Sequence, residues 1–204
     1  MVGMNLRRGS TLSILALPFM AILSACASNM GELSNAYSPE DAADIQNNLA
    51  GFREPALYDD RALRGYNARY RLTTFGIRCL RYTIRLDEAA DGKVTGRFKS
   101  RDDCPHHADR ARTNRSFSSS SADIGELNEL IVEAGMFREA MQIWTRQEDP
   151  NSICVDGIGL MFERRDSEGY RVTLANKPCT ASEDVLAVAS KFIEIAQAKQ
   201  AGVL

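Results

Sequence analysis

The chain of 204 residues contains only two histidines, the adjacent His106 and His107. They lie in the acidic stretch Asp102-Asp103-Cys104-Pro105-His106-His107-Ala108-Asp109. Imidazole and carboxylate groups both suit Zn²⁺ or Cu²⁺, so His106 and His107 are weak candidates for metal ligands. Neighbouring side chains on an extended segment point to opposite sides, however, and rarely bind one ion. The favoured interpretation is an exposed polar loop, and no metal or cofactor is predicted.

The serine run from Ser116 to Ser121 resembles no nucleophile motif. The patterns G-x-S-x-G and H-E-x-x-H are absent, and no glycine-rich phosphate loop precedes a helix. A Ser-His-Asp arrangement would have to take its histidine from the loop containing His106 and His107. The run is therefore predicted to be a linker and a helix cap. A hydrolase or metal-dependent enzyme centred on the histidines is the less favoured alternative to a protein without catalytic activity.

Arginines crowd the first two predicted strands, on the face opposite Leu80, Tyr82 and Ile84. Their guanidinium groups can bind carboxylates and other oxyanions through two parallel hydrogen bonds. This pattern is typical of a solvated sheet face, and it also suits a binding surface for an acidic protein or a polyanionic glycan. The members of this candidate binding face are Arg69, Arg71, Arg81 and Arg85, with Arg78 nearby.

The N-terminus has the pattern of a secretory signal peptide: Arg7 and Arg8, an apolar block from Leu12 to Leu23, and a small-residue exit. The block is too short to span a bilayer, which needs about 20 apolar residues. Its end, Leu23-Ser24-Ala25-Cys26, resembles the lipobox of bacterial lipoproteins. The resemblance implies cleavage before Cys26 and lipidation of Cys26, and hence a membrane-bound envelope protein. Ala27 in place of aspartate favours the outer membrane, facing the periplasm.

Four further cysteines, Cys79, Cys104, Cys154 and Cys179, would then lie in an oxidising compartment. An even number favours two disulfides over a zinc site, because zinc sites use closely spaced pairs. Cys79 and Cys104 are separated by the same interval as Cys154 and Cys179. This spacing suggests two β-β-α repeats, each closed by its own disulfide, although other pairings stay open.

Hydrophobic periodicity predicts the elements that position these residues. Ser38-Pro39-Glu40-Asp41 is typical of a helix start, and that short helix is expected to end near Gly51. Period-two alternation predicts strands over 66–74, 80–86, 93–100, 158–162 and 170–174, with residues 101–120 as a loop. Helical spacing predicts helices over 123–134, ending at Gly135, and after Thr180-Ala181-Ser182-Glu183, a predicted capping box. The stretch from Met136 to Trp144 is ambiguous.

These elements predict an α+β domain in which an antiparallel sheet of about five strands carries two amphipathic helices on one face, stabilised by disulfides. The expected organisation is a signal peptide (1–25), a lipid-anchored tether with a short helix (26–65) and one domain (66–204). The segment from Ala134-Gly135-Met136-Phe137 to Tyr170-Arg171-Val172, with Trp144, Asp156-Gly157 and Phe162-Glu163 between, loosely resembles small uncharacterised bacterial envelope domains. That resemblance implies no activity.

The formal net charge of −2 gives no reason to expect a nucleic-acid partner. The preferred function is a non-catalytic, lipid-anchored envelope protein that binds a protein partner through the arginine-rich face or through the sheet edge. The alternative is an inhibitor of an envelope-directed hydrolase.

Overall fold

One mixed sheet of seven strands organises the part of the chain that the structure, a computed structural model, describes: residues 39–76, 80–102, 112–143, 157–177 and 180–197. The strands lie in the order β4-β3-β2-β1-β6-β7-β5. All neighbouring pairs are antiparallel except β5 and β7, which are parallel. The strands are β1 (Tyr66–Gly76), β2 (Leu80–Ala89), β3 (Val94–Asp102), β4 (Arg112–Ser119), β5 (Met141–Ile143), β6 (Ile158–Asp166) and β7 (Gly169–Lys177).

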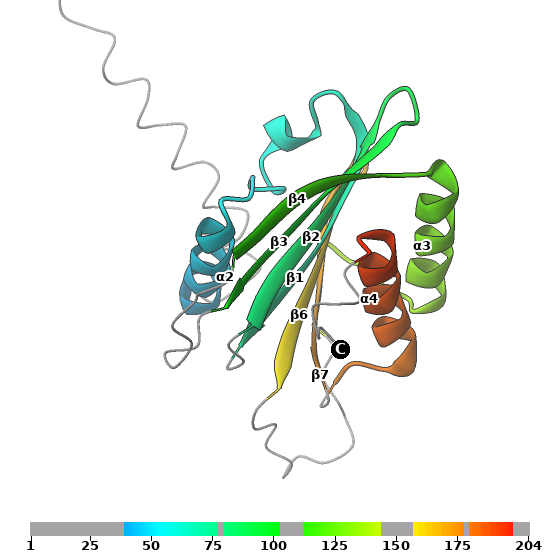
Figure 1. Cartoon of the computed structure of the whole chain (residues 1–204). Coiled ribbons are helices and arrows are strands. Elements are labelled where there is room, and N and C mark those ends of the chain that lie inside the picture. The colour runs from blue at the N-terminus through cyan, green and yellow to red at the C-terminus, as the bar shows by residue number, and fades with distance from the viewer. Residues whose placement is uncertain (1–38, 77–79, 103–111, 144–156, 178–179, 198–204) are drawn as a thin grey trace, which may run out of the picture.

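Helices cover both faces of the sheet (Figure 1). α3 (Ser121–Glu133) and α4 (Glu183–Ile195) lie side by side on one face, as the helical spacing predicts. The other face carries α2 (Pro39–Phe52) and the short 3₁₀ helix η1 (Asp60–Leu63). The result is a three-layer α+β arrangement, in which α2 and η1 of the segment predicted as a tether with a short helix form the third layer.

The main core lies between the sheet and the pair α3 and α4. Leu72, Ile84 and Phe162 project from three strands and are fully buried there. Phe162 meets Phe192 of α4 with ring centroids 6.3 Å apart. Burial of each such side chain stabilises the fold by roughly 1.5–3 kcal/mol relative to exposure.

A smaller apolar cluster holds α2 on the opposite face. Ile45 and Leu49, four residues apart on one side of the helix, pack with the buried Met161 of β6 and Val172 of β7. The predicted short helix therefore forms, and its apolar pair fixes it across the sheet.

The prediction of about five strands is wrong, because β4 and β5 are additional. β4 occupies part of the predicted loop 101–120, and β5 lies in the ambiguous stretch after Met136. β4 also makes the two proposed β-β-α repeats unequal, since it lies between the first hairpin (β2 and β3) and α3, whereas α4 directly follows the second hairpin (β6 and β7). Cys79, Cys104, Cys154 and Cys179 lie outside the described residues, so disulfide stabilisation remains a prediction.

The helix ends carry the predicted types of capping residue, but the N-cap of α4 lies two residues after the predicted one. Ser120 caps α3 and forms a capping box with Asp123, and Gly135 adopts a positive φ of 65° just after the helix, as predicted. α4 is capped by Ser182, whose side chain accepts from the backbone N–H of Val185. The predicted capping box on Thr180 is therefore wrong.

Candidate binding site

A fully buried ion pair lies at the centre of the sheet face that α2 covers. The side chains of Arg71 (β1) and Glu163 (β6) are both inaccessible to solvent. The Arg71 Nε and Nη2 donate to the two carboxylate oxygens at 2.5 and 2.6 Å, and Tyr170 Oη donates to the same carboxylate at 3.0 Å. Burial alone lowers the pKa of Arg71, but the charge and hydrogen bonds of Glu163 outweigh it and raise that pKa. Arg71 therefore stays charged.

The chain segment after α2 is held on this face by the same kind of chemistry. Residues 52–63, here called the strap, run from the end of α2 through η1. The fully buried carboxylate of Glu54 lies 2.5 Å from Arg85 Nη1 and 2.6 Å from Lys99 Nζ. Arg71 Nη1 donates to the Pro55 carbonyl at 2.6 Å. The carboxylate of Glu54 is thus surrounded by cations of β1, β2 and β3.

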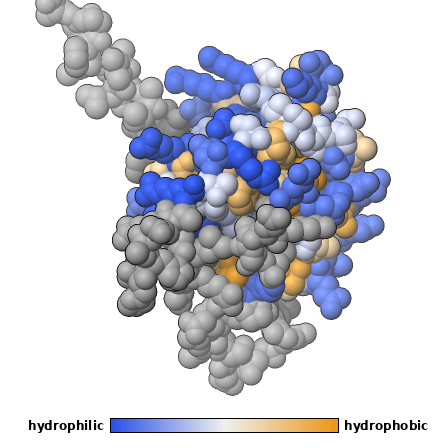
Figure 2. All heavy atoms as spheres, in the orientation of Figure 1, coloured by the Kyte–Doolittle hydropathy of each residue, from blue (hydrophilic) through white to orange (hydrophobic). Residues whose placement is uncertain are grey.

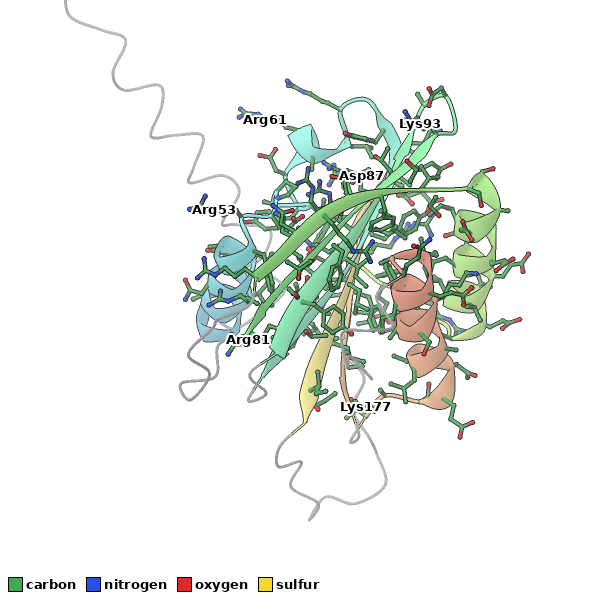
Figure 3. The ribbon with its side chains drawn as sticks, viewed as in Figure 1. Arg53, Arg61, Arg81, Asp87, Lys93 and Lys177 are labelled. Atoms are coloured by element: carbon green, nitrogen blue, oxygen red, sulfur yellow. The ribbon has the colours of Figure 1, made fainter. Side chains whose placement is uncertain are left out.

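A second contact joins the far end of the strap to β1. Arg69 donates from Nη1 to the carbonyl of Ala62 at 2.7 Å and from Nε to Asp87 at 2.7 Å. Figure 3 shows Asp87 within the molecule, whereas Arg53 and Arg61 project outward from the strap. The basic groups of the strap therefore face solvent, while Arg69 and Arg71 of β1 are buried.

These contacts correct the predicted binding face. Arg69 and Arg71 are 7% and 0% exposed, so the strap and not a partner occupies them in this fold. The Arg85 side chain is 14% exposed, and Arg81 is half-buried. Alternation correctly places the four arginines on one sheet face, but it contains no information about what covers that face.

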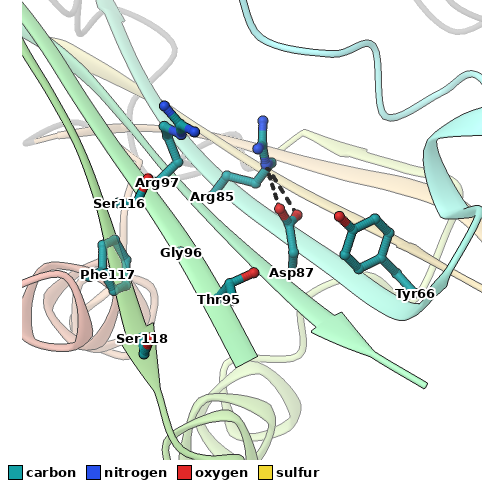
Figure 4. A pocket seen from close by; sticks show the side chains of 9 residues that line it. All are labelled: Tyr66, Arg85, Asp87, Thr95, Gly96, Arg97, Ser116, Phe117 and Ser118. Atoms are coloured by element: carbon teal, nitrogen blue, oxygen red, sulfur yellow. Dashed lines mark hydrogen bonds and ion pairs between the residues drawn. The ribbon is translucent and has the colours of Figure 1, made fainter. Parts of the chain in front are cut away.

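The strap leaves a hollow of about 400 Å³ uncovered, here called the β3–β4 trough (Figure 4). Arginine, hydroxyl and carboxylate side chains line most of it. Its lining residues are Tyr66, Arg85, Asp87, Thr95, Gly96, Arg97, Ser116, Phe117 and Ser118. The described residues on the face seen in Figure 2 are mostly hydrophilic, with apolar ones between them. Such a surface suits recognition of a polar or charged group better than an apolar one.

Three arginines lie opposite one another on the neighbouring strands β1, β2 and β3. The row that they form ends at the trough. Arg71 pairs with Arg85 and Arg85 with Arg97, each directly opposite on neighbouring strands. Like charges placed directly opposite are destabilising unless they are compensated. We call Arg71, Arg85 and Arg97 the arginine row.

Compensation of the arginine row decreases towards β4. Arg71 has Glu163, and Arg85 has Glu54 and Asp87. Arg97 has no acidic partner among the described residues; its guanidinium donates to the amide oxygen of Asn114 at 3.1 Å. Arg97 is half-buried at the trough wall, beside Arg85 in Figure 4. Of the two arginines that line the trough, it is the one without an acidic partner in the described part of the chain.

β4 beside the trough is an edge strand among the described strands, because its one partner there is β3. Its eight residues pair with β3 in a register without a break and contain no proline. An edge strand of this length presents unpaired backbone groups to which another strand can bind. The opposite edge, β5, has only three residues and offers much less.

Other predicted site residues lie outside the described residues: Cys26, the four later cysteines, His106 and His107. Within the described ranges, no group of three or more metal-ligating side chains exists. No helix among them is long and apolar enough to cross a membrane.

Sequence reasoning missed the trough itself. The sequence predicts a strand for Arg97, a linker for Ser116 and a tether for Glu54. One available signal was the composition of Arg112 to Ser119, which contains no acid and only one large apolar residue, Phe117. Comparison with known proteins found no protein-family model and no curated protein that matches the chain.

Proposed function

We propose that this chain is a non-catalytic lipoprotein of the bacterial cell envelope, attached to the membrane through lipid on Cys26 and exposed to the periplasm. It binds a protein partner through the β4 edge. The observation that supports binding is the regular, solvent-exposed edge strand beside a polar trough. Addition of a strand to an exposed edge is a common mode of protein recognition, because backbone hydrogen bonds supply affinity.

The attachment is supported by Leu23-Ser24-Ala25-Cys26. A bacterial lipoprotein carries several acyl chains, and multiple chains give stable membrane binding where one does not. Cells producing the full chain should incorporate labelled palmitate into the wild-type protein and not into a Cys26→Ala variant. Equal labelling of the two proteins would rule out this attachment.

Partner binding is tested by a photo-crosslinking amino acid at Thr113, an exposed β4 residue outside the trough lining. The matched control is Glu129, which is exposed on α3 and does not belong to β4. In the native cells, Thr113 should give one crosslinked species of defined mass, and Glu129 should not. Absence of a Thr113 crosslink in cells that accumulate the protein would contradict the proposal.

The identity of the crosslinked protein also tests the alternative function, inhibition of an envelope-directed hydrolase. If it is a hydrolase, its activity is measured with and without the full chain. Inhibition in equal stoichiometry would make this chain an inhibitor, and unchanged activity would leave a binding protein.

A further inference from the structure

We propose that the β3–β4 trough recognises a carboxylate side chain of an extended acidic segment that the partner adds along β4, with Arg97 as the recognising residue. This inference rests on the proposed function, since it specifies which kind of segment occupies the edge. It goes beyond edge binding because backbone pairing along β4 would by itself accept any sequence.

The register places Arg97 where an added strand can reach it. Arg97 lies directly opposite Ser116 of β4, so both side chains project from the same sheet face. A residue of an added strand opposite Ser116 would lie two strand spacings, about 10 Å, from Arg97. Ser116 is short and exposed, so a long side chain can cross over it towards the guanidinium.

Neighbouring β4 residues keep that path open. Ser118 and Asn114 lie on the same face as Ser116, because side chains alternate along a strand. All three are small or medium polar residues, and all three are exposed. The large side chain of Phe117 projects from the other face of β4, where its ring lies against Gly96. The trough is therefore shallow over β4 and bounded by Arg97 on β3.

Charge selects the occupant. β4 carries Arg112 and Arg115 and no acidic residue, and Arg97 has no acidic partner among the described residues. A carboxylate would complete the compensation that Glu163, Glu54 and Asp87 supply to the rest of the arginine row. Charge-assisted arginine–carboxylate hydrogen bonds are among the stronger polar contacts, and their fork geometry suits a single side chain.

The same charges disfavour a second copy of this chain as the occupant. Pairing β4 with β4 of another copy would bring Arg112 and Arg115 of each copy onto one joined edge. Registers of such a pair that place these arginines directly opposite one another are unfavourable. An acidic partner segment meets no such repulsion.

The experiment uses the full lipidated chain in detergent micelles and two labelled nonapeptides. One alternates threonine with glutamate, and the other alternates threonine with glutamine. Fluorescence anisotropy should show the glutamate peptide binding about tenfold more tightly than the glutamine peptide, since tenfold corresponds to about 1.4 kcal/mol, below the usual value of a charged hydrogen bond. Arg97→Gln should remove this preference, whereas Arg61→Gln, an exposed arginine on η1, should retain it.

Folding of the variants is checked independently. Arg97→Gln relieves the like-charge contact with Arg85, so its thermal midpoint should equal or exceed that of the wild type. Equal binding of the two peptides, an unchanged preference in folded Arg97→Gln, or no peptide binding would overturn the inference. Dimerisation through β4, or binding of anionic-lipid vesicles that depends on Arg97 in place of peptide binding, would also overturn it.

Failure of this inference and failure of the proposed function give different results. If the Thr113 crosslink in cells persists at full yield in Arg97→Gln, edge binding stands and carboxylate recognition by Arg97 falls. If no crosslink forms with either protein, the proposed function falls as well.

Discussion

Removing Glu163 tests whether the buried ion pair sets the stability of the sheet. In a Glu163→Leu variant, Arg71 keeps its charge at a position with no solvent access and retains only the Pro55 carbonyl and a distant Glu54 carboxylate at 4.0 Å. Breaking a buried pair by removing one partner costs about 3–5 kcal/mol. For a domain of this size, the corresponding fall in melting temperature is roughly 6–20 °C.

The double variant Arg71→Met with Glu163→Leu separates charge burial from loss of packing. It leaves no buried charge, so its main polar cost is the Pro55 carbonyl without its donor, about 1–3 kcal/mol. We therefore expect the double variant to be more stable than either single variant, with a large coupling energy between the two positions.

The assay is urea unfolding followed by circular dichroism at pH 7, with any disulfides kept intact. Exposed Glu129→Leu on α3 is the matched control and should change the free energy of unfolding by less than about 0.5 kcal/mol. The reasoning is refuted if Glu163→Leu costs less than about 1 kcal/mol. It is also refuted if the double variant loses as much as the sum of the two single variants.

Two further predictions concern the strap and a helix cap. Glu54→Gln removes the charge that Arg85 and Lys99 surround, so amide hydrogen exchange should accelerate over α2 and the strap while β1 keeps its protection; equal acceleration in both would contradict a separately held strap. Asp123→Ala should destabilise the fold at pH 7 by about 0.3–1 kcal/mol, because its carboxylate completes the α3 capping box at the helix N-terminus. Hydrogen bonds from Ser120 and Ser119 lower the pKa of Asp123 to about 2, below its ordinary value of 3.8, so this contribution is present above about pH 4 and lost as the pH falls towards 2. Urea unfolding of both proteins across that range should show the difference shrinking, and a constant difference would contradict the assignment.

The sequence was most informative where one sheet face meets the main core. Tyr70 and Leu72 alternate with polar neighbours, and the pattern correctly places them towards α3 and α4. Helical spacing likewise identified the apolar sides of those helices. Strand alternation and helical spacing both arise because one face of an element is buried, so the periodicity of apolar residues in the sequence reveals that face directly.

β4 was missed because its signal is weak. Phe117 is its one large apolar residue, and the serines around it are typical of loops and caps. As an edge strand its outward face has little to bury, so its pairing with β3 depends on backbone hydrogen bonds that leave no mark in hydropathy. The exposed composition that suits a binding edge is the same feature that hides the strand.

The ionic contacts of the strap were missed for a different reason. Glu54 is a single acid in an irregular stretch, and nothing local distinguishes it from a solvated residue of a tether. Its burial depends on Arg85 and Lys99, more than 30 residues away, and on the apolar pair of α2 that brings it to the sheet. A contact of this kind is fixed by tertiary packing, which sequence periodicity does not describe.

Two departures from ordinary sheet design meet at one corner of this molecule. Arg85 lies directly opposite Arg97, a like-charge pair that costs stability, and β4 leaves a regular edge where most sheets protect theirs. Within the arginine row, Arg71 is compensated by Glu163. Local rules are typically broken at functional sites, where a partner supplies what the fold lacks. An acidic strand would correct both departures at once, because its backbone would pair the β4 edge while its carboxylate compensates Arg97.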